Sequence, residues 1–217
     1  MTKSEEQSGI AAAYNDWAET YDIDQNRTRD LAAETLRQVD LDLKGRRVVE
    51  VGCGTGRNTA WLRERAAEIV GLDFSEAMLA RARIRVNDPR VRFIQHDACA
   101  PWPLADSSAD VVIAMLILEH VEHLQIVFAE AARVVAAGGQ FFVCELHPMR
   151  QLAGGQAQFS NTKTGARTRV PAFLHDVSDY VNAGLTAEFE LQHLGEWRDA
   201  DGEANSQPRL LSLLFRL

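Results

Sequence analysis

Three closely spaced glycines, Gly52, Gly54 and Gly56, stand between a short β-branched run and a helix-compatible stretch. This order places bare backbone N–H groups at a helix N-terminus, where no Cβ keeps a ligand at a distance. Such a loop is typical of nucleotide binding at the carboxyl edge of a doubly wound sheet. A purely structural turn between strand and helix is the alternative that the loop alone leaves open.

The spacing of the glycines narrows the kind of nucleotide. A dinucleotide-binding loop needs G-x-G-x-x-G, but the position of its third glycine is taken by Arg57. No lysine followed by Ser or Thr stands in the loop, which excludes a phosphate-binding P-loop. A ligand with a ribose but no pyrophosphate fits better. Asp73 ends the next apolar run and can accept hydrogen bonds from both ribose hydroxyls, while Asp97 ends the third and can accept one from an exocyclic amine.

Alternating strands and helices must position these side chains. Apolar runs predict strands at 46–51, 91–95, 110–116 and 140–146, with another that ends at Asp73. Ser75 is expected to cap the helix that follows, and a second amphipathic helix runs from Leu124 until Gly138 and Gly139 stop it. Because the strands are apolar throughout, they indicate a parallel sheet covered by helices on both faces.

The pattern changes after Pro148. Residues 149–174 are polar and form a long excursion, for which a hairpin is one expected form. A helix and two apolar strands then complete the chain. Since no helix separates these two strands, we expect the sheet to close with an antiparallel hairpin.

The composition is that of one soluble globular domain. The 217 residues are 46% apolar and 25% charged, and the formal charge of −8 argues against nucleic acid as a general partner. No run is apolar enough to span a bilayer, the polar start MTKSEEQSG is unlike a signal peptide, and three scattered cysteines predict neither disulfides nor a metal site. We therefore expect a cytoplasmic protein, monomeric or homodimeric, without a metal, a membrane or a nucleic acid as partner.

Five segments resemble the motifs of class I S-adenosylmethionine-dependent methyltransferases of the small-molecule type, in order and at the usual intervals. They are EVGCGTG (50–56), GLDFSEAML (71–79), QHDA (95–98), the segment 109–121 and the segment 134–140. The resemblance implies a Rossmann-like α/β fold, a doubly wound seven-stranded sheet that is mostly parallel with an antiparallel last strand. It also implies S-adenosyl-L-methionine (SAM) as cofactor and S-adenosyl-L-homocysteine (SAH) as its product.

The resemblance covers about residues 45–147 and suggests how a single methyltransferase domain is organised around them. Residues 1–44 are expected to form an N-terminal helical cap and residues 45–147 the cofactor-binding core. Residues 148–175 would be a substrate-side insertion, and residues 176–217 the helix and strands that close the sheet.

The resemblance gives the glycine loop the methionine part of the cofactor. It implies that Gly52, Gly54 and Gly56 border this moiety, with Cys53 as a small side chain within the loop. Glu50 would hold the ammonium group, directly or through water.

The resemblance implies that residues at the ends of the next two strands bind the nucleoside part of the cofactor. The resemblance implies that Asp73 binds the ribose and that Phe74 and Met78 contact the adenine face. Asp97 would accept a hydrogen bond from the adenine amine, and the backbone N–H of Ala98 would meet the ring.

Residues around the transferred methyl group are implied at two further places. Met115 and Leu116, at the end of the fourth strand, would flank the sulfonium. The segment with Tyr14, Trp17 and Tyr21 is similar to the opening segment that closes over the cofactor in many small-molecule members of the family. We expect Tyr21 to contact the cofactor and Tyr14 and Trp17 the acceptor; packing of these aromatic rings on the core is the alternative.

The chemistry needs a base only where the acceptor must lose a proton, so the motifs name no catalytic residue. His147, at the end of the fifth predicted strand, is our preferred candidate, with His120 and Tyr14 as further ones. Candidate acceptor residues near the excursion are Arg150, which could hold an anionic group, Phe173 and His175. For each of them the alternative is a purely structural role, as an exposed charge or as a side chain of the core.

The sequence thus predicts a SAM-dependent methyltransferase (EC 2.1.1.-) that acts on an oxygen or nitrogen of a small molecule. The alternatives are an N-methyltransferase or protein methyltransferase, a nicotinamide-dependent oxidoreductase and a non-catalytic cofactor-binding protein. Arg57 and the Asp97-Ala98 pair speak against the oxidoreductase.

Overall fold

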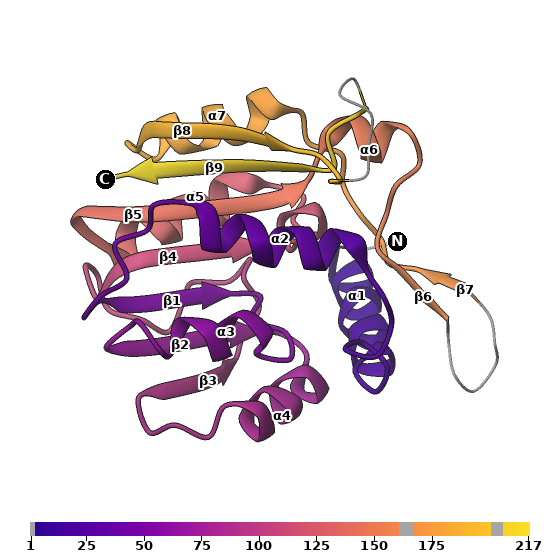
Figure 1. The fold of residues 1–217 in the computed structure, drawn as a ribbon, viewed down its shortest axis with the longest axis horizontal. Helices are drawn as coiled ribbons and strands as arrows, with labels where there is room; N and C mark the ends of the chain where they lie inside the picture. Colours follow the sequence, from indigo (N-terminus) through magenta and orange to yellow (C-terminus); the bar gives the residue numbers. More distant parts are fainter. Residues whose placement is uncertain (1–2, 161–166, 201–205) are drawn as a thin grey trace.

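The computed structural model describes residues 3–160, 167–200 and 206–217 of the chain. Its centre is a seven-stranded sheet in the order β3-β2-β1-β4-β5-β9-β8 (Figure 1). The strands are β1 (Arg47–Val51), β2 (Glu68–Asp73), β3 (Val91–Gln95), β4 (Ala109–Met115), β5 (Val135–Leu146), β8 (Glu190–Trp197) and β9 (Leu210–Arg216). Strands β1 to β5 are parallel, and β9 runs antiparallel to both of its neighbours. The predicted doubly wound α/β sheet with an antiparallel last strand is confirmed.

The central strands are apolar throughout because they are buried on both faces. In β4, Val111 and Ile113 belong to one apolar cluster, whereas Val112 and Ala114 belong to another. Successive side chains of a strand point to opposite faces, so each set needs its own layer of helices. The first cluster includes residues of α2 (Arg27–Gln38) and α3 (Arg57–Leu62), and the second includes residues of α5 (Leu124–Val134) and α7 (Val177–Thr186).

The carboxyl ends of the parallel strands meet at one edge of the sheet. In Figure 1 this edge is on the right, where α1 (Lys3–Trp17) lies across it beside the hairpin of β6 (Gln158–Ser160) and β7 (Arg167–Arg169). Ile10 and Trp17 of α1 pack against Val170, which follows the hairpin. The excursion thus contains the expected hairpin, although residues 161–166 lie outside the described residues. It begins with a short helix that the sequence analysis did not predict, α6 (Pro148–Leu152).

Two helix ends test the expected boundaries. The predicted cap of α4 (Glu76–Arg85) is confirmed, because the Ser75 hydroxyl accepts a hydrogen bond from the Met78 N–H at 3.2 Å. The predicted end of α5 at Gly138 and Gly139 is wrong: α5 ends at Val134 and β5 begins at once. Gly139 instead serves the strand, since a Cβ there would lie 2.7 Å from the carbonyl oxygen of Asp110 in β4.

In the described part of the chain, no helix combines the length and the apolar character that crossing a lipid bilayer requires.

The contact between α7 and β9 generates a stability prediction. A Cβ at Gly184 would lie 2.3 Å from the ring of Phe215, and this ring is enclosed by the rings of Phe128, Phe141 and Phe189. We expect Gly184→Ala to lower the free energy of unfolding by about 1–3 kcal/mol, as overpacking of a core does. Urea denaturation measures this change.

The matched control is Gly9→Ala in α1, where nothing lies within 4 Å of an added Cβ. There the better helix propensity of alanine should leave the stability unchanged or raise it. Equal effects of the two substitutions would contradict the close packing of α7 on β9.

Candidate functional site

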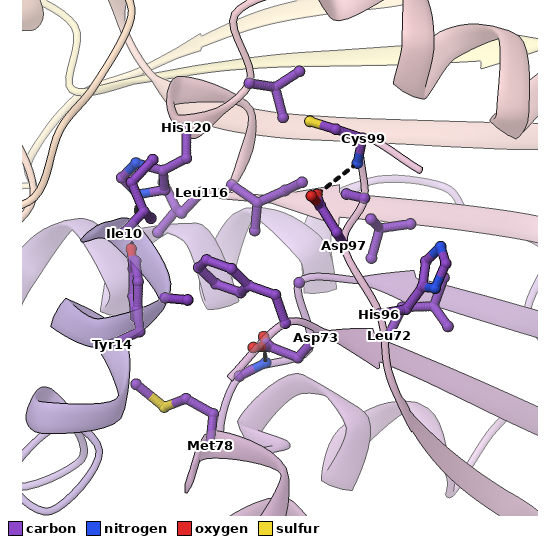
Figure 2. Close-up of a pocket in the computed structure, with 18 of the residues that line it drawn as sticks. Ile10, Tyr14, Leu72, Asp73, Met78, His96, Asp97, Cys99, Leu116 and His120 are labelled. Atoms are coloured by element: carbon purple, nitrogen blue, oxygen red, sulfur yellow. Dashed lines mark hydrogen bonds between the residues drawn. The ribbon is translucent and has the colours of Figure 1, made fainter. Parts of the chain in front are cut away.

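A cavity of about 310 Å³ lies at the carboxyl edge of the sheet. The loops after β1, β2, β3 and β4 form most of its wall, and α1 contributes Ile10, Ala11 and Tyr14. Figure 2 shows Tyr14 and Ile10 on one side of this space, across from Leu116 and Asp97, with Asp73 and Met78 at its base. We call it the edge cavity.

The loop after β1 owes its shape to its glycines. The backbone φ is +72° at Gly52, +53° at Gly54 and +74° at Gly56, values that residues with a side chain rarely adopt. A Cβ at Gly52 would also lie 2.0 Å from the side chain of Ile117, so this glycine lets the loop after β4 come close. Gly56 has a different role, because a Cβ there would lie 3.1 Å from the side chain of Ala82 in α4.

The carboxylate of Asp73 joins two loops of the edge cavity. One oxygen accepts the N–H of Gly54 at 2.8 Å, and the other accepts the N–H of Ser75 at 2.9 Å. Burial raises the pKa of Asp73 to about 6 in spite of these donors. Because a carboxylate oxygen has two lone pairs, each of the two Asp73 oxygens can accept one more hydrogen bond from a ligand in the cavity.

Between the carboxylates of Asp73 and Asp97, the wall of the edge cavity is apolar. Phe74 and Met78 line it on the β2 side, and Asp97 and Ala98 line it after β3. The Asp97 carboxylate accepts the backbone N–H of Cys99 at 2.8 Å (Figure 2). A flat apolar group that carries hydrogen-bond donors at both ends, such as a nucleoside, suits this arrangement.

Glu145 of β5 fixes the turn after β4. One of its carboxylate oxygens accepts the N–H groups of Ile117 and Leu118, both at 2.9 Å. Burial raises the pKa of Glu145 to about 8. Within this turn Leu116 has a φ of +56°, a conformation that is uncommon for a leucine and that the surrounding contacts must maintain.

A second cavity, of about 280 Å³, lies beyond Leu116. It shares three wall residues with the edge cavity, namely Tyr14, Tyr21 and Leu116. Three arginines from separate parts of the chain also line it: Arg29 of α2, Arg150 of α6 and Arg209 just before β9. We call it the arginine cavity. Molecules bound in the two cavities would therefore be next to each other.

Tyr14 and His120 form a buried pair whose proton positions follow from their partners. The Nδ1 atom of His120 lies 2.7 Å from the carbonyl oxygen of Pro171, which can only accept, so Nδ1 carries a hydrogen. Burial lowers the pKa of His120 to about 4, and the ring is neutral at pH 7. Its Nε2 atom therefore accepts the hydrogen bond of the Tyr14 hydroxyl at 2.8 Å.

Glu119 is a buried carboxyl group on the wall of the arginine cavity. The side-chain amide of Gln151 donates a hydrogen bond to it at 3.5 Å. Burial raises the pKa of Glu119 to about 7. A group with this pKa can take up or release a proton near neutral pH.

The edge cavity brings together most of the residues that we expected to bind a cofactor. They are Tyr21, Gly52, Gly54, Asp73, Phe74, Met78, Asp97, Ala98, Met115 and Leu116. Three expected residues, Glu50, Cys53 and Gly56, are not on its wall. Glu50 is buried in β1, where it accepts the hydroxyl of Thr59 at 2.5 Å and where burial raises its pKa to about 8.

The candidates for catalysis and acceptor binding are divided by the structure. Tyr14 and His120 line the edge cavity, and Tyr14, Trp17 and Arg150 line the arginine cavity. Tyr14 thus borders both cavities, His120 only the edge cavity, and Trp17 and Arg150 only the arginine cavity.

Three further candidates, His147, Phe173 and His175, line neither of these cavities. The Nδ1 atom of His147 accepts the N–H of Met149 at 3.2 Å at the start of α6, and its Nε2 atom lies 3.3 Å from Glu196. His175 is buried and donates to the carbonyl oxygen of Val121 at 2.7 Å. Their functional roles stay predictions from sequence.

Sequence reasoning did not single out Arg29, Arg209 or Glu119. A sequence feature could have pointed to Glu119, because it lies within a segment that resembles the family and directly before His120. No sequence feature points to Arg29 and Arg209, since only the folded chain brings these two distant positions together. In the described part of the chain, no group of three or more His, Cys, Asp or Glu side chains could hold a metal ion.

Comparison with known proteins agrees with this geometry. A family model described as a methyltransferase domain matches residues 49–143. AN0656, an uncharacterized methyltransferase of Emericella nidulans, is 32% identical to this chain, and the match covers 82% of this chain and 75% of that protein. Two other relatives are longer, and the chain spans 27% and 37% of their lengths.

Solved structures agree as well. An S-adenosylmethionine-dependent methyltransferase from Mesorhizobium loti superposes with a TM-score of 0.74 at 26% identity, over 87% of this chain and 99% of that one. DhpI, in a complex with SAM and HEP, shares the fold over 100% of both chains with a TM-score of 0.76 at 21% identity. Together with the glycine loop and the carboxylates of the edge cavity, these matches show that the chain belongs to the class I S-adenosylmethionine-dependent methyltransferases.

Proposed function

We propose that the chain transfers a methyl group from SAM to an oxygen or nitrogen atom of a small-molecule acceptor. The observation that carries this proposal is the pair of cavities that share Tyr14, Tyr21 and Leu116 as a common wall. One cavity has the features of a nucleoside site, and the other has room for a second molecule. The complex of DhpI with SAM supports the same cofactor for this chain.

The residues of the edge cavity fit this cofactor. The lone pairs that Asp73 keeps beyond Gly54 and Ser75 suit the two ribose hydroxyls. Asp97 suits the adenine amine, and Phe74 and Met78 offer apolar contact to the faces of the ring. Gly52 and Gly54 leave space for the amino-acid part because neither carries a Cβ.

When bound, SAM supplies an electrophilic methyl group on a sulfonium, so the chain has only to align the acceptor and exclude water. Tyr14, Tyr21 and Leu116 are placed for both tasks, since each borders both cavities.

The N-terminal segment beside the edge cavity is hydrogen-bonded to the loops after β1 and β2. Asn15 of α1 accepts the hydroxyl of Ser75 at 2.7 Å, and Asp22, just after α1, accepts the hydroxyl of Thr55 at 2.9 Å. Residues 1–44 therefore act as a cap in our proposal. Residues 148–175 act as the acceptor-side insertion, because Arg150 and Gly155 to Gln158 line the arginine cavity.

In this proposal Glu119 is the base that takes a proton from the acceptor. The pKa of about 7 gives its carboxylate enough basicity to take a proton from an acceptor near neutral pH. The pKa of about 4 makes His120 a much weaker base, so the Tyr14–His120 pair is better suited to orienting the acceptor through the Tyr14 hydroxyl. His147 remains a candidate from sequence alone.

Cofactor binding provides the first test. We expect Asp73→Asn to weaken the affinity for SAM by about ten- to a hundredfold, the usual effect of losing hydrogen bonds to a charged group. Isothermal titration calorimetry measures the affinity. Asp110→Asn is the matched control, because Asp110 pairs with Arg47 and lines neither the edge cavity nor the arginine cavity.

An unchanged affinity of Asp73→Asn would contradict the ribose assignment. Titration with NAD provides a check on the whole proposal. Micromolar binding of NAD without binding of SAM would overturn it.

Turnover provides the second test. With labelled SAM and the small-molecule fraction of a cell extract as acceptor source, we expect labelled product that forms faster as the pH rises through about 7, because Glu119 acts as a base only when ionised. Glu119→Gln should remove this pH dependence and lower the rate about a hundredfold or more.

The exposed neighbour Glu122 supplies the control variant, Glu122→Gln, which should keep both the rate and the pH profile. Full activity in Glu119→Gln together with a loss in His147→Ala would move the role of base to His147. Binding of SAM without any labelled product would favour a non-catalytic protein.

A further inference from the structure

Arg29 is a buried cation without a carboxylate partner in the described part of the chain. The residue is only 9% exposed, and two of its side-chain nitrogens donate to the backbone carbonyls of Tyr21 and Asp24. Its third nitrogen, Nε, is buried and has no hydrogen-bond partner. Because a guanidinium group loses its hydration on burial, a cation in this state favours the arrival of an anion.

The other two arginines of the arginine cavity share one carboxylate. Arg209 binds Asp199 with two nitrogens, both at 2.6 Å, while Arg150 reaches the same carboxylate at 3.4 Å. The Nε atom of Arg150 is also buried without a partner. One carboxylate therefore balances two guanidinium groups, and Asp199 is not itself on the cavity wall.

The carboxyl group of Glu119, which is on this wall, does not remove the excess of positive charge. Burial raises the pKa of Glu119 to about 7, so this group is partly protonated at neutral pH. Tyr14 and Tyr21 are neutral, since burial raises the pKa of each phenol. A surplus of guanidinium groups, those of Arg29, Arg150 and Arg209, thus lines a space large enough for a small molecule.

We propose that the three arginines of this cavity, Arg29, Arg150 and Arg209, bind an oxyanion group of the methyl acceptor, a carboxylate, phosphonate or phosphate. The inference rests on the methyl transfer proposed above and adds the chemical class of the acceptor. Guanidinium groups bind oxyanions through paired N–H donors, and aromatic rings such as that of Trp17 give the rest of the molecule an apolar surface. The nucleophile then lies at the opposite end of the acceptor, at the wall formed by Tyr14 and Leu116.

Binding to the SAH-loaded protein tests this inference with defined probes. The probes are 4-hydroxybenzoate, its uncharged analogue 4-hydroxybenzamide, and inorganic phosphate, each titrated by calorimetry. We expect 4-hydroxybenzoate or phosphate to bind, and 4-hydroxybenzamide to bind at least about tenfold more weakly than 4-hydroxybenzoate. Binding of phosphate alone would place the acceptor among the phosphonates and phosphates.

Variants show whether the arginines are responsible. Arg150→Gln should weaken binding of the anionic probe about tenfold or more. Arg169→Gln is the control, because Arg169 is an exposed arginine of the same excursion and is absent from the cavity wall. Arg29→Lys is a second variant, which keeps the charge of a buried position and should weaken binding by removing the planar fork.

The affinity for SAH and the thermal unfolding of every variant are measured first. If SAH binds but neither anion does, or if 4-hydroxybenzamide binds as well as 4-hydroxybenzoate, the inference is overturned and the methyltransferase proposal stands. Equal losses in Arg150→Gln and Arg169→Gln would also overturn it. If SAH does not bind, the proposed function fails and the inference fails with it.

Discussion

The hydrogen bonds that Asp73 accepts from Gly54 and Ser75 hold the functional edge of this protein together. They connect the glycine loop after β1 to the start of α4, and both loops border the edge cavity. Backbone N–H groups at the ends of parallel strands have no partners within the sheet, so a buried carboxylate is an efficient acceptor for them. Asp73 thereby shapes the cavity and remains available to a ligand.

Glu145 of β5 plays the same part at another position along the same sheet edge. It accepts two N–H groups of the turn after β4 and so maintains the unusual backbone of Leu116 between the two cavities. In both cases a carboxylate that binds loop amides is buried deeply enough to have a raised pKa. The framework of the site therefore depends on buried hydrogen-bond acceptors as well as on apolar packing.

The sequence was most informative where chemistry and secondary structure coincide. Asp73 and Asp97 could be predicted because Asp73 ends β2 and Asp97 follows the end of β3 by two residues, and parallel strands bring such residues to one edge. The arginine cavity could not be predicted, since Arg29, Arg150 and Arg209 come from three distant segments with no common pattern. His147 shows the opposite difficulty: its position at the end of β5 is that of a ligand-facing residue, but its ring packs at the start of α6 instead.

The shared wall between the cavities links their opening. Tyr14 belongs to α1 and Tyr21 to the segment just after it, yet both also line the arginine cavity. A displacement of α1 that exposes one cavity therefore removes part of the boundary of the other. The position of this one segment of the chain thus sets part of the boundary of both cavities.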